Sequence, residues 1–421
     1  MTLPRTPGAL VLGGDFLIEL GVARSLGRRG IPVWVIGAAG GTIGGHRLSA
    51  VRASRHCRRS LEWPAAGEPE RVGHLLDVAK RHGLSGWVLI ASGDNEAALV
   101  ARNHDALSAA YRLTTPPWDV LRWTYDKRRT YDLAARVGVP VPETWQPQGV
   151  DDLEAIDQAL PVVLKPAVKD VTNRFTAARA WPAHTPEQLR RLYDEAVSLV
   201  PADTVLVQRL VPGGGAAQVS FACLASGGSI LAELTARRSR QYPADFGQGS
   251  TLVETVDLPE LREPCARLLA ELGYDGLMEL EFKRDARDGT YRLLDMNARP
   301  WVWHPLGAAA GVDFPHLLHR MALGEDVGGG RRAAPGHRWV HLALDAPSAL
   351  GAIRRGRLRA SDYVRSLRRP VRLATLALDD PLPALADLGL LAAGAVRRRR
   401  PGAGLAATAA AGHATAVPPA R

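Results

Sequence analysis

Residues 278–300 place acidic, amide and basic side chains at the spacing of two β-strands. In the first stretch apolar residues alternate with charged ones, namely Met278, Leu280 and Phe282 with Glu279, Glu281 and Lys283. In the second stretch Leu293, Asp295 and Asn297 are expected to share one face, because alternate residues of a strand point to the same side. Asp288-Gly289 between the stretches is typical of a hairpin turn. This hairpin would place Glu281 opposite Asp295.

Two carboxylates that face each other across a sheet repel, and a bound cation removes the repulsion. Glu281, Asp295 and Asn297 offer the oxygen ligands that Mg²⁺ prefers, and Mg²⁺ takes few protein ligands when phosphate oxygens complete its shell. Arg299 follows with a guanidinium fork suited to phosphate or carboxylate. The hairpin alone equally fits a solvated, charged outer face.

The elements that precede this hairpin begin with a β-α-β unit. Residues 9–14 form an apolar run that ends in two glycines, residues 16–29 have helical periodicity, and residues 32–36 form a second strand, so a parallel sheet is expected. A dinucleotide oxidoreductase is disfavoured, because the complete glycine motif and an acidic residue after the second strand are both missing.

Polar residues follow the next predicted strand, at residues 86–91. Asp94 and Asn95 either lie at a ligand-binding sheet edge or cap the helix at 96–102. A helix is predicted over residues 119–137, and it contains Asp126-Lys127.

The middle of the chain reads as α+β. The strand at 161–166 carries one lysine, Lys165, which needs an anion or another acceptor if it is buried. Strands are predicted at 204–211, 218–224 and 229–234, a polar segment at 235–249 and a helix at 259–272.

The charge of the chain is concentrated at its C-terminal end. From residue 331 onward there are 16 Arg and 5 Asp, whereas residues 1–330 hold 37 basic and 38 acidic residues. The basic character therefore gives no argument for nucleic-acid binding by the main body.

Three scattered cysteines indicate neither a disulfide framework nor a zinc site. With no signal-peptide pattern and no long apolar run, we expect a cytoplasmic protein that does not bind membranes.

Five motifs in order resemble those of the ATP-grasp ligases. They are Asp126-Lys127 with the segment 138–142, Leu164-Lys165-Pro166, the segment 207–213 (VQRLVPG), Glu281, and Asp295-Met296-Asn297-Ala298-Arg299-Pro300. The resemblance covers roughly residues 9–325, and the D-x-N-x-R ending is its most specific part.

The resemblance implies roles for several residues. Nucleotide binding falls to Lys127, Lys165, Lys169, Gln208, Arg209, Leu210 and Val211; the metal ligands are Glu281, Asp295 and Asn297; the catalytic arginines are Arg299 with Arg238 or Arg240. The implied cofactors are ATP and Mg²⁺, with Mn²⁺ as an acceptable substitute. The implied reaction joins a small carboxylate to an amine through an acyl phosphate, and a homodimer is compatible with it.

Within the superfamily, the chain looks most like the carboxylate–amine ligases that include D-aspartate ligases. The segments 240–247 and 299–305 carry this likeness, and Trp301, Trp303 and His304 either line an acceptor pocket or pack in the core. Two features depart from the family pattern. The loop 167–176 has no glycine, so the side chains of Lys169 and Arg174 would have to supply the positive charge over the phosphates. The segment that would form the adenine hinge, Gln208–Val211, is not followed by an acidic residue that could bind the ribose, and only Gln218 is a candidate for that role.

The predicted architecture is α/β followed by α+β. A Rossmann-like domain is expected at 1–118 and an ATP-grasp domain at 119–327, with a central subdomain at about 140–210 and a grasp subdomain at about 211–327. A small appended subdomain at 328–394 and a disordered tail at 395–421 complete the chain. The competing functional hypothesis is a nucleotide-binding regulatory protein without catalysis. The clustered carboxylates argue against this hypothesis, because a site without catalysis has no physical need for them.

Overall fold

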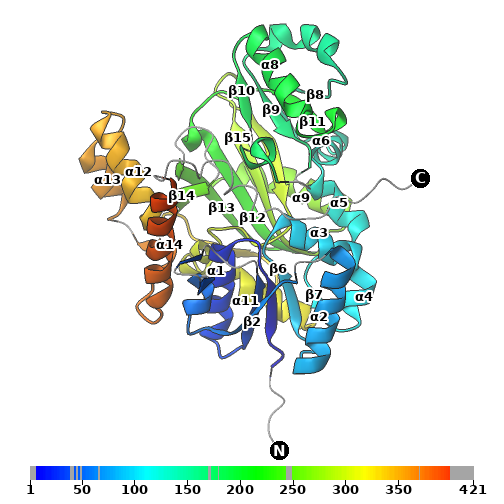
Figure 1. Cartoon of the computed structure of the whole chain (residues 1–421), viewed down its shortest axis with the longest axis vertical. Helices are drawn as coiled ribbons and strands as arrows, with labels where there is room; N and C mark the ends of the chain where they lie inside the picture. The colour runs from blue at the N-terminus through cyan, green and yellow to red at the C-terminus, as the bar shows by residue number, and fades with distance from the viewer. Residues whose placement is uncertain are drawn as a thin grey trace, which may run out of the picture.

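The structure is a computed structural model that describes residues 6–37, 42–43, 46–47, 50–64, 67–168, 172–178, 180–242, 249–368 and 370–398. In Figure 1 the N-terminal part lies at the bottom, a small sheet with its helices lies at the top, and a large sheet runs between them. Among the described residues, no helix combines the length and the apolar character needed to cross a lipid bilayer.

The N-terminal part contains a parallel sheet in the order β5-β2-β1-β6-β7. Its strands are β1 (Ala9–Leu12), β2 (Val33–Gly37), β5 (Cys57–Glu62), β6 (Val88–Ala91) and β7 (Arg112–Leu113), and its helices are α1 (Phe16–Gly27), α2 (Glu68–His82), α3 (Asp94–Arg102) and α4 (His104–Ser108). Successive residues of β1 enter two different cores: Ala9 and Val11 pack with α1, and Leu10 and Leu12 pack with α2. The predicted parallel β-α-β opening is confirmed.

The predicted single helix at 119–137 is two helices, α5 (Trp118–Tyr125) and α6 (Lys127–Arg136). Asp126 separates them because its backbone is extended and its carboxylate accepts a hydrogen bond from the Arg128 N–H, which caps α6. This break places Lys127 in the first turn of α6.

The small sheet is antiparallel, in the order β10-β9-β11-β8. Its strands are β8 (Thr144–Trp145), β9 (Val162–Pro166), β10 (Trp181–Ala183) and β11 (Val205–Arg209), and the helices α7 (Arg174–Ala178) and α8 (Pro186–Val197) accompany it. A core of its own, with Leu164, Phe175 and Tyr193, holds this unit together.

The large sheet has the order β16-β15-β12-β13-β14-β18-β19, with β17 beside β13. Its strands are β12 (Gln218–Ser226), β13 (Ser229–Tyr242), β14 (Gly249–Thr255), β15 (Gly276–Arg284), β16 (Tyr291–Asn297), β17 (Arg331–Arg332), β18 (Arg338–Val340) and β19 (Val371–Leu373). Strand β13 continues through most of the predicted polar segment 235–249, because Thr235 and Ala236 are buried and the strand pairs with β14.

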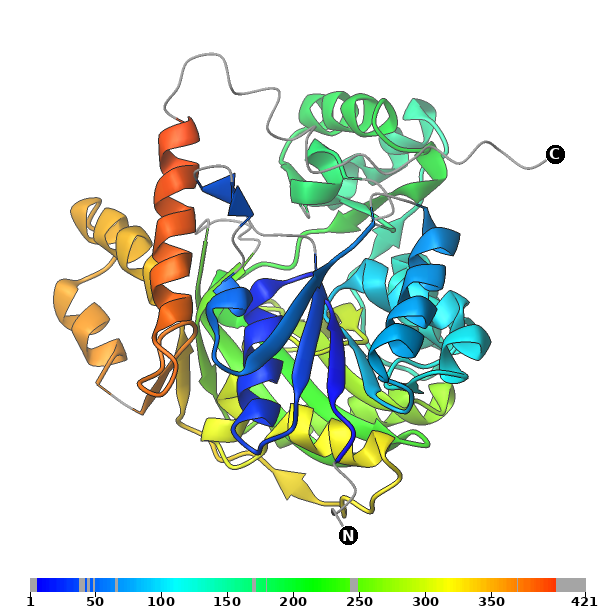
Figure 2. The same ribbon diagram turned by 60° about the horizontal axis from the view of Figure 1, so that its bottom comes forward.

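The C-terminal region adds strands β18 and β19 to this sheet instead of standing apart from it. Its helices are α12 (Leu342–Arg354), α13 (Ala360–Ser366) and α14 (Leu382–Arg398), which follow α9 (Arg262–Leu272), α10 (Pro305–Ala309) and α11 (Phe314–Ala322) in the chain. Figure 2 shows α14 standing beside the N-terminal part. Helix α14 reaches Arg398, so the predicted tail boundary at 395 is wrong, and residues 399–421 lie outside the described residues.

Candidate functional site

The hairpin of β15 and β16 has the predicted pairing, with Glu281 opposite Asp295 and Glu279 opposite Asn297. A bulge follows Glu281, so that Phe282 pairs with Leu293. The prediction that Leu293 shares a face with Asp295 is therefore wrong, and Leu293 packs with Phe282 in an apolar core. The bulge separates a polar face from an apolar face along one short strand.

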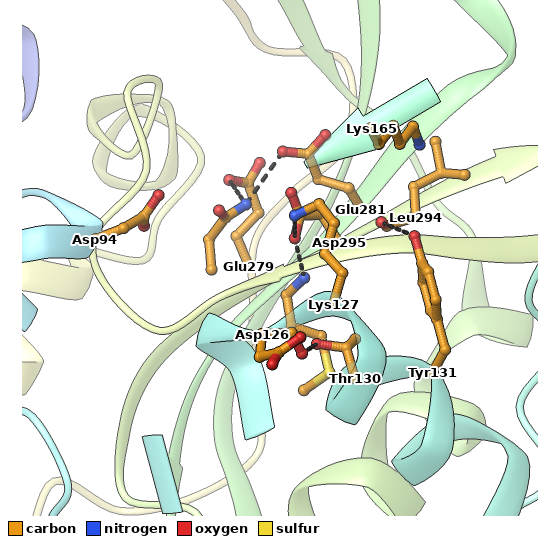
Figure 3. A network of polar contacts seen from close by, with 12 residues as sticks. Asp94, Asp126, Lys127, Thr130, Tyr131, Lys165, Glu279, Glu281, Leu294 and Asp295 are labelled. Atoms are coloured by element: carbon orange, nitrogen blue, oxygen red, sulfur yellow. Dashed lines mark hydrogen bonds and ion pairs between the residues drawn. The ribbon is translucent and has the colours of Figure 1, made fainter. Parts of the chain in front are cut away.

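The polar face holds a fourth acceptor that the sequence analysis did not select, Glu279. The Asn297 amide donates to Glu281 Oε1 at 3.1 Å and to Glu279 Oε2 at 3.4 Å, and Ser220 Oγ donates to Glu279 at 3.0 Å. Figure 3 shows Glu279 beside Glu281 and Asp295. Burial, followed by the charge of Glu281, raises the pKa of Glu279 to about 7. The two-residue spacing from Glu281 was the sequence signal for Glu279.

Cationic and amide donors surround the two predicted carboxylate ligands. Lys127 Nζ lies 2.7 Å from Asp295 Oδ1. Glu281 Oε2 accepts from Gln218 Nε2 at 2.7 Å and lies 3.4 Å from Arg238 Nη2. The carboxylate and amide oxygens on this face therefore outnumber the protein groups that donate hydrogen bonds to them.

In the described part of the chain, no group of three or more His, Cys, Asp and Glu side chains is arranged to hold a metal by itself. Two carboxylates, an amide and the oxygens of a bound phosphate still match the ligands of Mg²⁺, which usually retains few protein ligands. The donor set thus fits a magnesium ion that arrives with a nucleotide.

Lys165 lies on β9 and donates to Gln208 Oε1 at 2.8 Å, across the β9–β11 pair. Burial, followed by the charge of Lys127, lowers the pKa of Lys165 to about 8. The predicted need of this lysine for an acceptor is confirmed.

The segment after β11 includes a backbone N–H group, that of Val211, that the described fold does not use. The N–H of Arg209 donates to Glu143 O at 2.8 Å, and the N–H of Leu210 donates to Pro161 O at 3.0 Å. The N–H of Val211 has no hydrogen-bond partner among the described residues. A ligand that lies against this segment can bind the Val211 N–H.

A cavity of about 330 Å³ joins these groups. It lies between the small sheet and the large sheet, and its lining residues include Lys127, Lys165, Gln208, Arg209, Leu210, Val211, Arg238, Glu281 and Asp295. A volume of this size is typical of small-molecule sites. The structure thus brings together most of the predicted nucleotide and metal residues.

Arg299 connects the hairpin to the N-terminal sheet. Its Nε lies 2.5 Å from Asp94 Oδ1, and its Nη2 donates to Asn297 Oδ1 at 3.3 Å. The α3 helix begins at Asp94, and its cap residue is Gly93, so the alternative that Asp94 or Asn95 caps this helix is wrong. Asp94 instead positions Arg299 at the carboxyl end of β6.

Arg238 and Arg240, predicted together, lie on opposite faces of β13. The ladder to β14 shifts between these two residues, so that Arg238 pairs with Val253 and Arg240 pairs with Leu252. Arg240 consequently binds the buried Asp345 with two hydrogen bonds, at 2.6 and 2.8 Å. Only Arg238 lies beside Glu281.

Two predictions remain, one for Lys169 and the segment 240–247 and one for Trp301 and Trp303. Lys169 and residues 243–247 lie outside the described residues. Trp301 and Trp303 are buried, 0% and 4% exposed, and Trp301 stacks edge-on against Phe314 at 5.0 Å, so they pack in the core and do not line an acceptor pocket.

The sequence of the chain is similar to a family of ATP-binding domains and to several curated proteins. Residues 126–328 match the model of the ATP-binding domain of the carbamoyl-phosphate synthase L chain. Among curated proteins, the chain is 24% identical to the C-terminal section of the carbamoyl phosphate synthase large chain of Methanopyrus kandleri, over 51% of this chain and 40% of that protein. It is 22% identical to the large chain of Vibrio cholerae, over 62% of this chain and 24% of that protein. The matches thus span less than half the length of these relatives.

Solved structures share the fold at low sequence identity. The biotin carboxylase domain of the Hydrogenobacter thermophilus 2-oxoglutarate carboxylase is 19% identical, with a TM-score of 0.58 over 77% of this chain and 71% of that chain. The L-amino acid ligase of Bacillus licheniformis is 15% identical, with a TM-score of 0.57 over 76% and 75%. N5-carboxyaminoimidazole ribonucleotide synthetase of Thermus thermophilus is 18% identical, with a TM-score of 0.56 over 78% and 81%.

Proposed function

We propose that this chain is an ATP- and Mg²⁺-dependent carboxylate–amine ligase of the ATP-grasp superfamily, because residues 126–328 match an ATP-binding domain model and the fold resembles that of an L-amino acid ligase. The proposed reaction activates a small carboxylic acid, such as an amino acid, as an acyl phosphate. An amine then displaces the phosphate and forms an amide or peptide bond. The observation that carries the proposal is the cavity whose lining residues include Lys165, Val211 and the Glu281–Asp295 pair.

The adenine base would lie against the segment after β11. The free Val211 N–H would donate to a ring nitrogen, and Lys165 with Gln208 would contact the polar edge of the base or the neighbouring phosphate. The hydroxyl groups of the ribose would face Gln218, since the described residues at the end of the hinge, Gly213–Gly215, carry no carboxylate.

The phosphates would extend toward the hairpin. Glu281, Asp295 and Asn297, with Glu279 behind them, would hold Mg²⁺, which would neutralise the developing charge of the transferred phosphoryl group. Lys127 would exchange Asp295 for a phosphate oxygen, because a bound cation takes over the neutralisation of Asp295.

The carboxylate substrate would enter at the side of Arg299. Asp94 holds this guanidinium between the hairpin and the carboxyl end of β6, so the arginine can orient the substrate carboxylate toward the phosphoryl group. Arg238 approaches from β13 beside Glu281. No protein nucleophile is required, since positioning and charge neutralisation carry the reaction.

The test measures ADP release by the full chain with ATP and Mg²⁺ against a panel of amino acids and small carboxylic acids. Hydroxylamine replaces the amine, so that an acyl phosphate is trapped as a hydroxamate. We expect one acid to give both ADP and hydroxamate, and Asp295→Asn to lose both. Asp288→Asn is the matched control, because Asp288 lies in the exposed turn of the same hairpin and pairs with Arg292.

Each other outcome has a defined meaning. ATP binding without turnover across the panel would favour the regulatory alternative over the ligase. Absence of ATP binding would refute the assignment of the cavity. Equal loss of activity in Asp288→Asn would show that the hairpin fold, and not the Asp295 carboxylate, is being measured.

A further inference from the structure

A second cavity, of about 240 Å³, lies between α1, α10 and β19. It shares no lining residue with the cavity around Lys165. Three distant parts of the sequence form it: the first helix of the N-terminal sheet, the segment that follows the hairpin, and the C-terminal region. Its chemistry is dominated by arginine.

Four guanidinium groups line this cavity, and three of them have carboxylate partners. The lining arginines are Arg24, Arg28, Arg29 and Arg372. The ion pairs are Arg24–Asp380 at 2.9 Å, Arg28–Asp379 at 2.7 Å and Arg29–Asp313 at 2.7 Å. One positive charge therefore remains uncompensated.

The uncompensated charge belongs to Arg372 on β19. This side chain is half-buried, and it has no hydrogen bond or ion pair with any residue that the structure describes. Burial, followed by the charges of Arg28 and Arg24, lowers its pKa. A partly desolvated guanidinium beside two other arginines is unfavourable without an anion.

The remaining lining groups do not supply that anion. Asp313 already accepts from Arg29 and, at 2.5 Å, from Ser25 Oγ. His304 is buried, and burial lowers its pKa to about 4, so it is neutral at physiological pH; its Nδ1 lies 2.8 Å from Trp301 O. The cavity is therefore a cationic space with room for a small molecule.

We propose that this cavity binds a small oxyanion, a phosphate or carboxylate group, through Arg372, with Arg28 and Arg29 at its edge. Guanidinium groups bind both kinds of oxyanion through paired hydrogen bonds. The bound anion would connect α1, α10 and β19. Because α10 begins at Pro305, shortly after Arg299, anion binding would also stabilise the segment that follows the metal hairpin.

The experiment titrates inorganic phosphate, and separately succinate, into the full chain at constant ionic strength, with calorimetry and thermal unfolding as readouts. Binding should raise the melting temperature, because the anion binds the folded state only. Arg372→Gln should weaken binding at this cavity at least tenfold and remove the part of the rise in melting temperature that this cavity contributes. Arg357→Gln, an exposed arginine outside the cavity, should behave as the parent protein does.

Preference for phosphate would indicate a phosphate ester as the natural ligand, and preference for succinate would indicate a carboxylate. Arg372→Lys retains the charge and should retain measurable binding, which separates loss of the site from loss of folding. Anion bound in the other cavity would be unaffected by Arg372→Gln. Equal binding by the parent and Arg372→Gln, or no binding by the parent, would overturn the proposal.

Discussion

Replacement of Lys127 by methionine tests the electrostatics of the hairpin most directly. Lys127 is 8% exposed, and its Nζ lies 2.7 Å from Asp295 Oδ1. Burial disfavours the charge of Lys127, but Asp295 and other neighbours outweigh it, so the pKa of Lys127 stays above its usual value. The lysine is therefore charged, and its loss removes the ammonium group that lies 2.7 Å from Asp295 Oδ1, beside the carboxylate of Glu281.

The cost follows from the burial of the two partners. Removal of one partner of a fully buried ion pair costs about 3–5 kcal/mol. The side chain of Asp295 retains 21% exposure, so the lower end, about 3 kcal/mol, is expected. With a denaturant slope of about 3 kcal/mol/M, the urea midpoint should fall by about 1 M.

The assay is urea unfolding followed by tryptophan fluorescence, with and without millimolar Mg²⁺. Mg²⁺ should restore part of the stability of Lys127→Met, because the ion compensates the same carboxylates, and should affect the parent protein less. Lys80→Met, at an exposed position of α2, is the control and should unfold within about 0.5 kcal/mol of the parent. A midpoint of Lys127→Met equal to that of the parent, with no added response to Mg²⁺, would refute the reasoning.

Two further predictions concern Lys165 and Arg240. The pKa of Lys165 is lowered to about 8 from the usual 10.5, so between these values the unfolded chain binds a proton that the folded chain lacks, and folding stability should rise with pH. This rise should be absent in Lys165→Met; unfolding at pH 8 and pH 10 checks it, and identical pH profiles would contradict it. Arg240→Ala should lower stability by about 3 kcal/mol, since it leaves the buried Asp345 without its guanidinium partner, while the hydrogen bond from Thr251 Oγ1 to the carboxylate remains. It should leave ATP affinity unchanged in calorimetry, and a large loss of ATP affinity would instead support the role at the reaction centre that the sequence predicted for Arg240.

The sequence predicted the hairpin and the pairing of its carboxylates because both depend on local spacing. Period-two alternation and the Asp288-Gly289 turn determine which residues of two adjacent strands meet, and the structure confirms Glu281 opposite Asp295. Lys165 was found by the same kind of argument, as a charged residue within an apolar strand. Glu279 could have been found from its spacing, and it was missed.

Other outcomes were decided by backbone irregularities. The bulge after Glu281 turned Leu293 into the core, and the shift between Arg238 and Arg240 separated two arginines that strict alternation places together. Such shifts depend on what packs against each face of the strand. The sequence of the strand itself does not contain that information.

The sequence by itself determined the pairing within the β15–β16 hairpin and the parallel opening, because each depends on residues close together in the chain. Only the tertiary structure decided that Asp94 pairs with Arg299, that Arg240 pairs with Asp345, and that Arg372 lies beside other arginines without a carboxylate partner among the described residues. Asp94 and Arg299 are 205 residues apart, and the cavity around Arg372 joins α1 to β19. Contacts over such distances depend on how whole sheets pack, and an arginine without a carboxylate partner can be recognised only when all its neighbours are in place.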